Sequence, residues 1–132
     1  MPVTLREIEG AVRAAWSPET AYASAEYLAR APERPGRGQC GTTALVVHDL
    51  LGGELLVAPV QGPGGLDGVH YWNRLADGDV DLTRDQFTTD ELVLEPRTVP
   101  RQPLPRPEPA RAAYLLLRER VFRALGQPHR NT

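Results

Sequence analysis

Residues 38–51 read GQCGTTALVVHDLL, and this stretch decides how the rest of the chain is interpreted. The apolar residues within 41–51 would cover nearly all sides of a helix, which predicts a buried helix. Gly52 and Gly53 follow directly and supply its C-terminal stop. The chain's single cysteine, Cys40, therefore stands where a loop becomes a buried helix.

The position of Cys40 is compatible with either a catalytic or a purely structural thiol. At a helix N-terminus, unpaired N–H groups and the positive end of the helix dipole favour the thiolate, which is the nucleophilic form. A free intracellular cysteine is more often a small core hydrophobe. Gln39 precedes Cys40, so its side-chain amide and the Cys40 N–H are expected to form an oxyanion hole. Gly38 and Gly41 leave the approach to the thiol uncrowded.

His70 is the histidine best placed to act as a general base. It opens the run His70-Tyr71-Trp72 after a glycine-rich loop, where a strand would hold the imidazole beside a cleft. The alternative is a histidine that packs on aromatic side chains and bonds to the backbone. His48 lies about 12 Å beyond Cys40 along the predicted helix. His129 lies in the C-terminal tail, where flexibility is expected, so neither is favoured.

A third group is needed to orient the imidazole, and Asp81 is the first candidate. A two-residue turn at Asp77-Gly78 would place Asp81 opposite Arg74, and the alternative roles for Asp81 are a salt bridge with Arg74 or a role in the turn. That register leaves Asp81 about 13 Å from His70, so a bulge or strong twist must bring it back. The alternative orienting groups are Asp79, Asp85 and Asn73.

The remaining polar residues predict substrate contacts rather than a bound metal or cofactor. One cysteine and three scattered histidines do not provide the roughly four convergent ligands of a zinc site. Residues 62–68 lack both the Gly-x-Gly-x-x-Gly order and a phosphate-binding lysine. We therefore expect no metal and no cofactor. Arginines near the site are suited to binding a carboxylate, and the predicted substrate-binding residues are Trp72, Arg74 and Arg37.

The pattern of apolar residues and turn signals predicts an α+β fold in a single domain. The core, residues 1–95, would hold the helix after Cys40 against a small antiparallel sheet of about three to four strands. Residues 96–109 contain six prolines and are expected to form a surface connector. A last helix would dock on the core or pair in a dimer. The predicted elements are helices 5–15, 18–30, 41–51 and 110–126, strands 54–60, 69–75, 80–82 and 92–94, and a helical turn at 83–86.

Composition narrows the class of protein further. Hydrophobic residues make up 41% and charged residues 24% of the 132 residues, close to the average for one globular domain. Fifteen Arg and no Lys against seventeen acidic residues give a net charge of −2, so we expect neither a nucleic-acid nor a membrane partner. The sequence has no secretory signal pattern. A lone cysteine permits no intrachain disulfide, and we expect a cytoplasmic protein.

Four motifs taken together resemble the YunG-like family of small bacterial proteins, over about residues 16–87. The motifs are Gly38-Gln39-Cys40-Gly41-Thr42-Thr43-Ala44-Leu45-Val46-Val47, Gly52-Gly53-Glu54, His70-Tyr71-Trp72-Asn73-Arg74-Leu75 and Asp81-Leu82-Thr83-Arg84-Asp85-Gln86-Phe87. The family is similar in layout to the transglutaminase-like and papain-like superfamily, in which a cysteine heading a helix precedes a histidine strand and an acid or amide strand. The proline connector and the last helix lie outside the resemblance and are expected to be an extension peculiar to this chain.

The resemblance implies a compact papain-like core with Cys40 as nucleophile, His70 as base and Asp81 as the orienting acid. We therefore expect a cysteine-nucleophile acyl-transfer enzyme that acts on an amide or thioester of a small or peptide-like substrate. It would be a hydrolase or deamidase if water accepts the acyl group, and an amide-forming transferase if an amine does. The alternative is a catalytically silent module that binds a ligand or a protein on the same fold.

Overall fold

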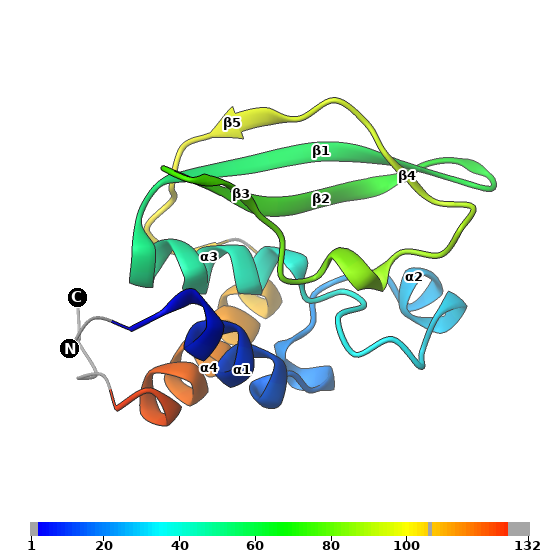
Figure 1. The fold of residues 1–132 in the computed structure, drawn as a ribbon. Coiled ribbons are helices and arrows are strands. Elements are labelled where there is room, and N and C mark those ends of the chain that lie inside the picture. The colour runs from blue at the N-terminus through cyan, green and yellow to red at the C-terminus, as the bar shows by residue number, and fades with distance from the viewer. Residues whose placement is uncertain (1–2, 106, 127–132) are drawn as a thin grey trace.

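The computed structural model describes residues 3–105 and 107–126. It has an antiparallel sheet on one side and helices on the other, which confirms the α+β class (Figure 1). The elements in chain order are α1 (Leu5–Ala15), η1 (Pro18–Thr20), α2 (Ala25–Arg30), α3 (Cys40–Leu51), β1 (Glu54–Gly62), β2 (Gly65–Leu75), β3 (Gly78–Val80), η2 (Arg84–Gln86), β4 (Leu92–Val93), β5 (Arg97–Val99) and α4 (Glu108–Ala124).

Helix α3 is the centre of the molecule, as its apolar sequence predicts. It lies between the sheet and the pair formed by α1 and α4 (Figure 1). The apolar core gathers side chains from all three helices, and burying each one contributes about 1.5–3 kcal/mol. The buried core residues are Ile8, Val12, Val46, Val47, Leu82, Tyr114, Leu117, Val121 and Phe122.

The two N-terminal predictions have different outcomes. Helix α1 has the predicted bounds, and Thr4 and Glu7 form the predicted capping box. The single helix expected over 18–30 is wrong, because the chain forms η1 and the short α2 with extended backbone at Ala21 between them. Long-range hydrogen bonds hold this break open: the Tyr22 N–H donates to the Gly38 carbonyl, and the Thr42 hydroxyl donates to the Thr20 carbonyl.

Strand β1 is the central strand of the sheet. It pairs with β2 along one edge and with both β4 and β5 along the other, and β3 pairs with the far edge of β2. The segment 61–68, expected as a loop, instead continues both strands, so β1 and β2 form a hairpin whose partners run as far as Gly62 and Gly65. The register of the hairpin shifts between Pro59 and Gln61, and the start of β2 is largely exposed.

The proline-rich segment packs more closely than the sequence predicts. The three non-proline residues between Pro96 and Pro100 form β5, which pairs with β1. Proline is excluded from central strands, but it is tolerated at the edge of a sheet. Arg101 then forms an ion pair with Asp49 on α3 (3.0 Å). Helix α4 packs within the same chain, where the Arg120 guanidinium donates to the Ala15 carbonyl (3.0 Å).

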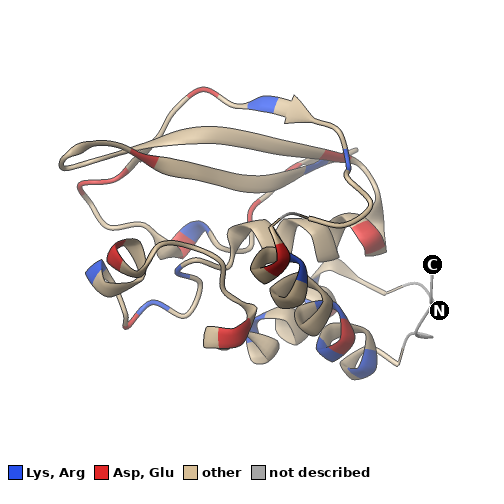
Figure 2. Ribbon diagram, turned by 180° about the vertical axis from the view of Figure 1, so that it is seen from behind, with Lys and Arg blue, Asp and Glu red and all other residues tan. Residues whose placement is uncertain are grey.

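Charged residues of both signs are interspersed over the helices and loops, whereas β1 and β2 carry few (Figure 2). Within 3–105 and 107–126, no helix combines the length and the apolar character that crossing a membrane requires.

Candidate active site

Cys40 is the first residue of α3, as the sequence predicts, and its side chain is half-buried. The first backbone hydrogen bond of the helix runs from the Thr43 N–H to the Gln39 carbonyl (3.0 Å). Among the described residues, the backbone N–H groups of Cys40, Gly41 and Thr42 make no backbone hydrogen bond. These three donors and the positive end of the helix dipole therefore lie beside the thiol.

His70 lies on β2 with 1% of its surface exposed. Its Nε2 donates to Oδ2 of Asp81 across 2.6 Å. The ring stacks on Trp72 at 5.2 Å between centroids and meets the edge of Phe87 at 4.7 Å. A buried imidazole held by a carboxylate and two aromatic rings has one orientation, with Nδ1 as the only ring nitrogen left for chemistry.

The strand register explains how Asp81 reaches His70. The predicted turn at Asp77-Gly78 is wrong by one position: Arg74 pairs with Asp79 and Leu75 with Gly78, so the turn residues are 76 and 77. This change moves the register by two residues and brings Asp81 level with Trp72, beyond the end of β3. Residues two apart on a strand share a face, so Asp81 arrives beside His70 and the expected separation of about 13 Å disappears.

The other acids and amides considered as orienting groups are engaged elsewhere. Asp79 accepts hydrogen bonds from Arg74 (2.8 Å) and Trp72 (3.0 Å). Asp85 pairs with Arg13 (2.8 Å), and the Asn73 amide donates to the carbonyl of Ala44 (2.9 Å). Oδ1 of Asp81 accepts from the backbone N–H and the hydroxyl of Thr83 (3.2 and 3.3 Å). The carboxylate is therefore fixed on both sides.

The surroundings of His70 favour its charged form. Burial lowers the pKa of His70, but the hydrogen bond to Asp81 and the nearby Cys40 thiol outweigh it and raise the pKa to about 9. Nδ1 is buried and makes no hydrogen bond of normal geometry with any described group. The raised pKa of His70 thus favours the imidazolium at neutral pH, with Nε2 bonded to Asp81 and Nδ1 without a hydrogen-bond partner among the described groups.

A cavity of about 790 Å³ opens in front of the thiol, and Cys40 and Gly41 form part of its wall. Val69 and Tyr71, the neighbours of His70 on β2, also line it, whereas His70 itself does not. Sequence reasoning places the sulfur and the ring together at the mouth of a pocket. In the structure Cys40 lines the cavity and His70 does not.

The structure does not bring the Gln39 side chain to the cavity, contrary to the expected oxyanion hole. Its amide donates to the Ser17 carbonyl (2.9 Å), and its carbonyl oxygen accepts from the Thr20 hydroxyl (2.8 Å). With 3% of its surface exposed, Gln39 anchors η1 to the start of α3. The donors that remain for an oxyanion are the N–H groups at the start of α3.

The residues expected to bind substrate also lie outside the cavity wall. Trp72 and Arg74 are both bonded to Asp79, on the side of β2 that carries His70. Arg37 has 4% of its surface exposed and is enclosed by protein groups. Of the two histidines set aside from the sequence, His48 lies in the last turn of α3, and His129 lies outside the described residues.

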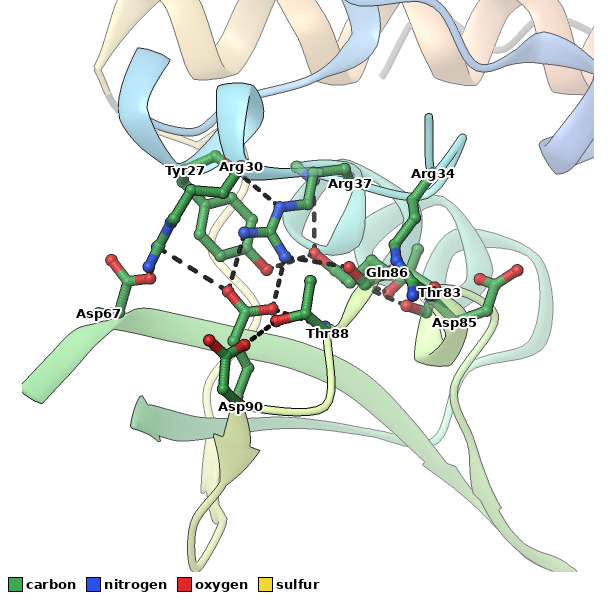
Figure 3. A network of polar contacts seen from close by, with 12 residues as sticks. Tyr27, Arg30, Arg34, Arg37, Asp67, Thr83, Asp85, Gln86, Thr88 and Asp90 are labelled. Carbon is green, nitrogen blue, oxygen red and sulfur yellow. Dashed lines mark hydrogen bonds and ion pairs between the residues drawn. The ribbon is translucent and has the colours of Figure 1, made fainter. Parts of the chain in front are cut away.

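Arg37 and Glu91 form a buried ion pair that we call the Arg37–Glu91 junction (Figure 3). The guanidinium meets both carboxylate oxygens (2.6 and 2.8 Å), donates to the Gln86 carbonyl (3.0 Å) and lies 3.5 Å from the centre of the Tyr27 ring. The hydrogen bonds from Arg37 lower the pKa of Glu91 to about 2. A loop arginine is usually solvated, so only long-range structure identifies this residue.

The junction joins the loop before Cys40 to the segment after Asp81. Gln86 makes the closest connection: its side-chain oxygen accepts from the Gly38 N–H (3.3 Å), and its amide donates to the Thr83 hydroxyl (2.9 Å). Thr83 in turn bonds to Asp81. A continuous set of hydrogen bonds therefore fixes the thiol-bearing helix relative to the carboxylate that holds His70.

Comparison with known proteins identifies the family of this chain. A family model described as YunG protein matches residues 4–126. The match includes the proline-rich segment and α4, so the expectation that these elements are an extension peculiar to this chain is wrong. The searches found no match among curated proteins and none among solved structures. Because the family model covers nearly all of its length, the chain belongs to the YunG family.

Proposed function

We propose that this protein is an acyl-transfer enzyme in which Cys40 is the nucleophile, His70 the general acid and base, and Asp81 the orienting group. The substrate would be an amide or thioester of a small or peptide-like molecule. One observation carries the proposal: Cys40 begins a buried helix and lines a cavity, and the His70 imidazole near its thiol is held by a carboxylate at 2.6 Å. These three residues have the chemistry that a nucleophile, a base and an orienting acid require.

The reacting form in this proposal is the thiolate of Cys40 beside the imidazolium of His70. The sulfur attacks the carbonyl carbon, an S–C bond forms, and the carbonyl electron pair moves to oxygen. When the intermediate collapses, the bond to the leaving amine or thiol breaks and His70 supplies its proton. Water or an amine then attacks the acyl carbon while His70 takes the proton of the attacking group, and the C–S bond breaks, which releases the product and the Cys40 thiolate. Asp81 keeps the imidazole in one orientation throughout and stabilises its positive charge.

The start of α3 would stabilise the oxyanion. The N–H groups of Cys40 and Gly41 make no backbone hydrogen bond within the described part of the chain, and both residues line the cavity. Preorganised N–H donors of this kind contribute about 3–4 kcal/mol each to the stabilisation of a tetrahedral intermediate. This arrangement needs no contribution from Gln39.

The layout also supports a papain-like or transglutaminase-like core as part of the proposal. In this chain a cysteine heads a helix, a histidine follows on a strand of an antiparallel sheet, and an acid follows the next strand. The order Cys, His, Asp and their meeting in space are the features that such a core requires. Fold analogy by itself does not determine the substrate.

Alkylation of Cys40 by iodoacetamide across pH 5–9, in the full chain, tests the proposal. We expect rapid labelling at pH 6, because the imidazolium favours the thiolate. His70→Ala should slow labelling at pH 6 about tenfold or more, whereas His48→Ala, on the same helix as Cys40 but at its other end, should not. Slow labelling at pH 6 that is the same in all three proteins would contradict the proposal and favour the binding module.

A second experiment tests whether Cys40 accepts an acyl group, which thiol alkylation does not report. The protein is mixed with a phenyl thioester of acetate, and intact mass reports an acetyl group on the chain. We expect acetylation in the wild type, none in Cys40→Ser, and slower acetylation in Asp81→Asn than in Asp79→Asn. The last pair is matched, because both acids lie near β2 but only Asp81 holds His70. Equal rates for these two variants would remove Asp81 from the mechanism.

A further inference from the structure

One row of paired residues crosses the wall of the cavity and ends beside Gly41, the residue that follows Cys40. Arg97 on β5 pairs with Val57 on β1, and Val57 pairs with Tyr71 on β2. Directly paired residues point to the same face of a sheet, and all three line the cavity. A methyl group added at Gly41, the neighbour of Cys40, would lie 3.8 Å from the Tyr71 ring. The row therefore leads from Arg97 to the start of α3, where Cys40 and Gly41 line the same cavity.

The wall of the cavity is mostly apolar and aromatic, and its few charged residues differ in how they are paired. Asp67 forms an ion pair with Arg30, and Arg101 pairs with Asp49. Arg97 forms no ion pair with any residue that the structure describes, and it is exposed. The charge available to a bound molecule is therefore one guanidinium, which suits a planar anion such as a carboxylate.

The spacing of the strands sets the length of the molecule that would span this row. Neighbouring strands lie about 4.8 Å apart, so the Arg97 and Tyr71 backbones are about 10 Å apart across β1. Val57 stands between them and offers only an apolar surface. A ligand that runs along this row from Tyr71 to Arg97 must therefore be apolar over about 10 Å and carry its charge at the Arg97 end.

We infer that the row Arg97–Val57–Tyr71 selects substrates whose reacting carbonyl bears an apolar arm of about 10 Å that ends in a carboxylate. This inference rests on the proposed function, since Cys40 is taken as the attacking group. The reacting carbonyl lies at Cys40, the arm lies over Val57, and the carboxylate binds Arg97. The row thus makes Arg97 a specificity-determining residue that takes no part in the chemical steps.

Two thiol reagents of equal length test this inference on the full chain. Both carry an iodoacetamido group on a six-carbon arm, which ends in a carboxylate in one reagent and in a neutral carboxamide in the other. Intact mass follows the rate of labelling of Cys40, and the readout is the ratio of the two rates within each protein. We expect the carboxylate reagent to react about tenfold faster in the wild type, as a charge-assisted bond predicts.

Arg97→Gln should bring this ratio close to one. Arg6→Gln removes an exposed arginine of α1 that does not line the cavity, and this change should leave the ratio unchanged. A wild-type ratio near one, or a ratio that survives in Arg97→Gln, would overturn the inference. If both reagents label Cys40 rapidly and at equal rates, the inference about Arg97 is overturned, but the proposed role of Cys40 is not.

Binding of an unreactive analogue keeps the inference testable if the thiol proves inert. The probe is 6-acetamidohexanoate, added to Cys40→Ser protein and followed by calorimetry. We expect saturable binding that Arg97→Gln weakens about tenfold and that Arg6→Gln leaves unchanged. Absence of binding at millimolar probe, or equal binding by Arg97→Gln, would reject the carboxylate-ended arm independently of any result on Cys40 chemistry.

Discussion

The Arg37–Glu91 junction and the cavity wall both adjoin the start of α3, and each contains an arginine. The two arginines differ in burial and in pairing. Arg37 is buried, and its guanidinium binds a carboxylate and two backbone carbonyls. Arg97 is exposed and has no ion-pair partner within the described residues. Arg37, which is bonded through all three guanidinium nitrogens, holds the structure together, whereas Arg97, which has no ion-pair partner within the described residues, is available to a ligand.

This contrast corrects the way arginines are interpreted from the sequence alone. Arg37 lies in the loop that leads directly into Cys40, and its closeness to Cys40 along the chain favours a substrate role. Arg97 lies in a proline-rich segment that is expected to act only as a spacer. In the folded chain their roles are exchanged, because pairing and burial, rather than distance along the chain, decide which charge remains free.

The largest effect is expected from breaking the junction. Arg37→Met leaves the Glu91 carboxylate buried without its main partner, which should cost about 3–5 kcal/mol of unfolding free energy. Arg123→Gln, which removes an exposed pair with Glu119, should cost less than about 0.5 kcal/mol. Urea unfolding at pH 7 measures both. A loss below about 1 kcal/mol in Arg37→Met would mean that the junction does not hold the site together.

The next effect concerns pH and the charge on His70. Its pKa rises from the ordinary 6.5 to about 9 in the folded chain, so the folded state binds the proton more tightly than the unfolded state. The resulting stability is complete below pH 6.5 and is lost as pH rises through 9, by roughly 3 kcal/mol. Urea unfolding at pH 6, 7.5 and 9 should show this decline in the wild type and a smaller one in His70→Ala. Equal declines would contradict it.

A smaller difference in unfolding free energy is expected between alanine variants of two glycines that have similar backbone angles. Gly38, in the loop tied down by the junction, has φ +78°, and Gly68, at the hairpin end of the cavity, has φ +80°. Alanine strains either position by about 1–2 kcal/mol. At Gly38 the added methyl would also lie 2.6 Å from Leu28, whereas at Gly68 it would meet nothing within 4 Å. Gly38→Ala should therefore be about 1 kcal/mol less stable than Gly68→Ala in urea unfolding. The reverse order would show that the loop before Cys40 is the looser region.

The smallest effect is expected at Arg97. Because this exposed side chain makes no ion pair within the described chain, Arg97→Gln should change the unfolding free energy by less than about 0.5 kcal/mol. Paired with Arg37→Met, it completes the comparison of a structural and a ligand-binding arginine. A loss of about 2 kcal/mol or more in thermal or urea unfolding would assign Arg97 a structural role instead.

Elements with strong local signals could be predicted from the sequence. The capping box of Thr4 and Glu7 marks the start of α1, and the apolar run after Cys40 with its glycine stop marks α3. Local signals also indicate Cys40, His70 and Asp81 as the residues to examine. Helix starts, helix stops and strand patterns depend on neighbours in the sequence, and this is why these predictions are informative.

The features that the sequence did not predict depend on contacts between distant residues. The Asp77-Gly78 pair marks the β2–β3 turn only to within one residue, and that one residue decides whether Asp81 meets His70. The break after η1 is held by bonds to residues 38 and 42. Glu91, the partner of Arg37, lies far along the chain. Local patterns contain no information about such partners.

The most direct test of the central claim is an NMR titration of the His70 imidazole in the wild type and in Cys40→Ser. If the thiol and the ring are neighbours and Asp81 holds the charged ring, the midpoint lies near pH 9 in the wild type and moves lower in Cys40→Ser. A wild-type midpoint at or below the ordinary 6.5, unchanged in Cys40→Ser, would show that the sulfur and the imidazole do not act as a pair.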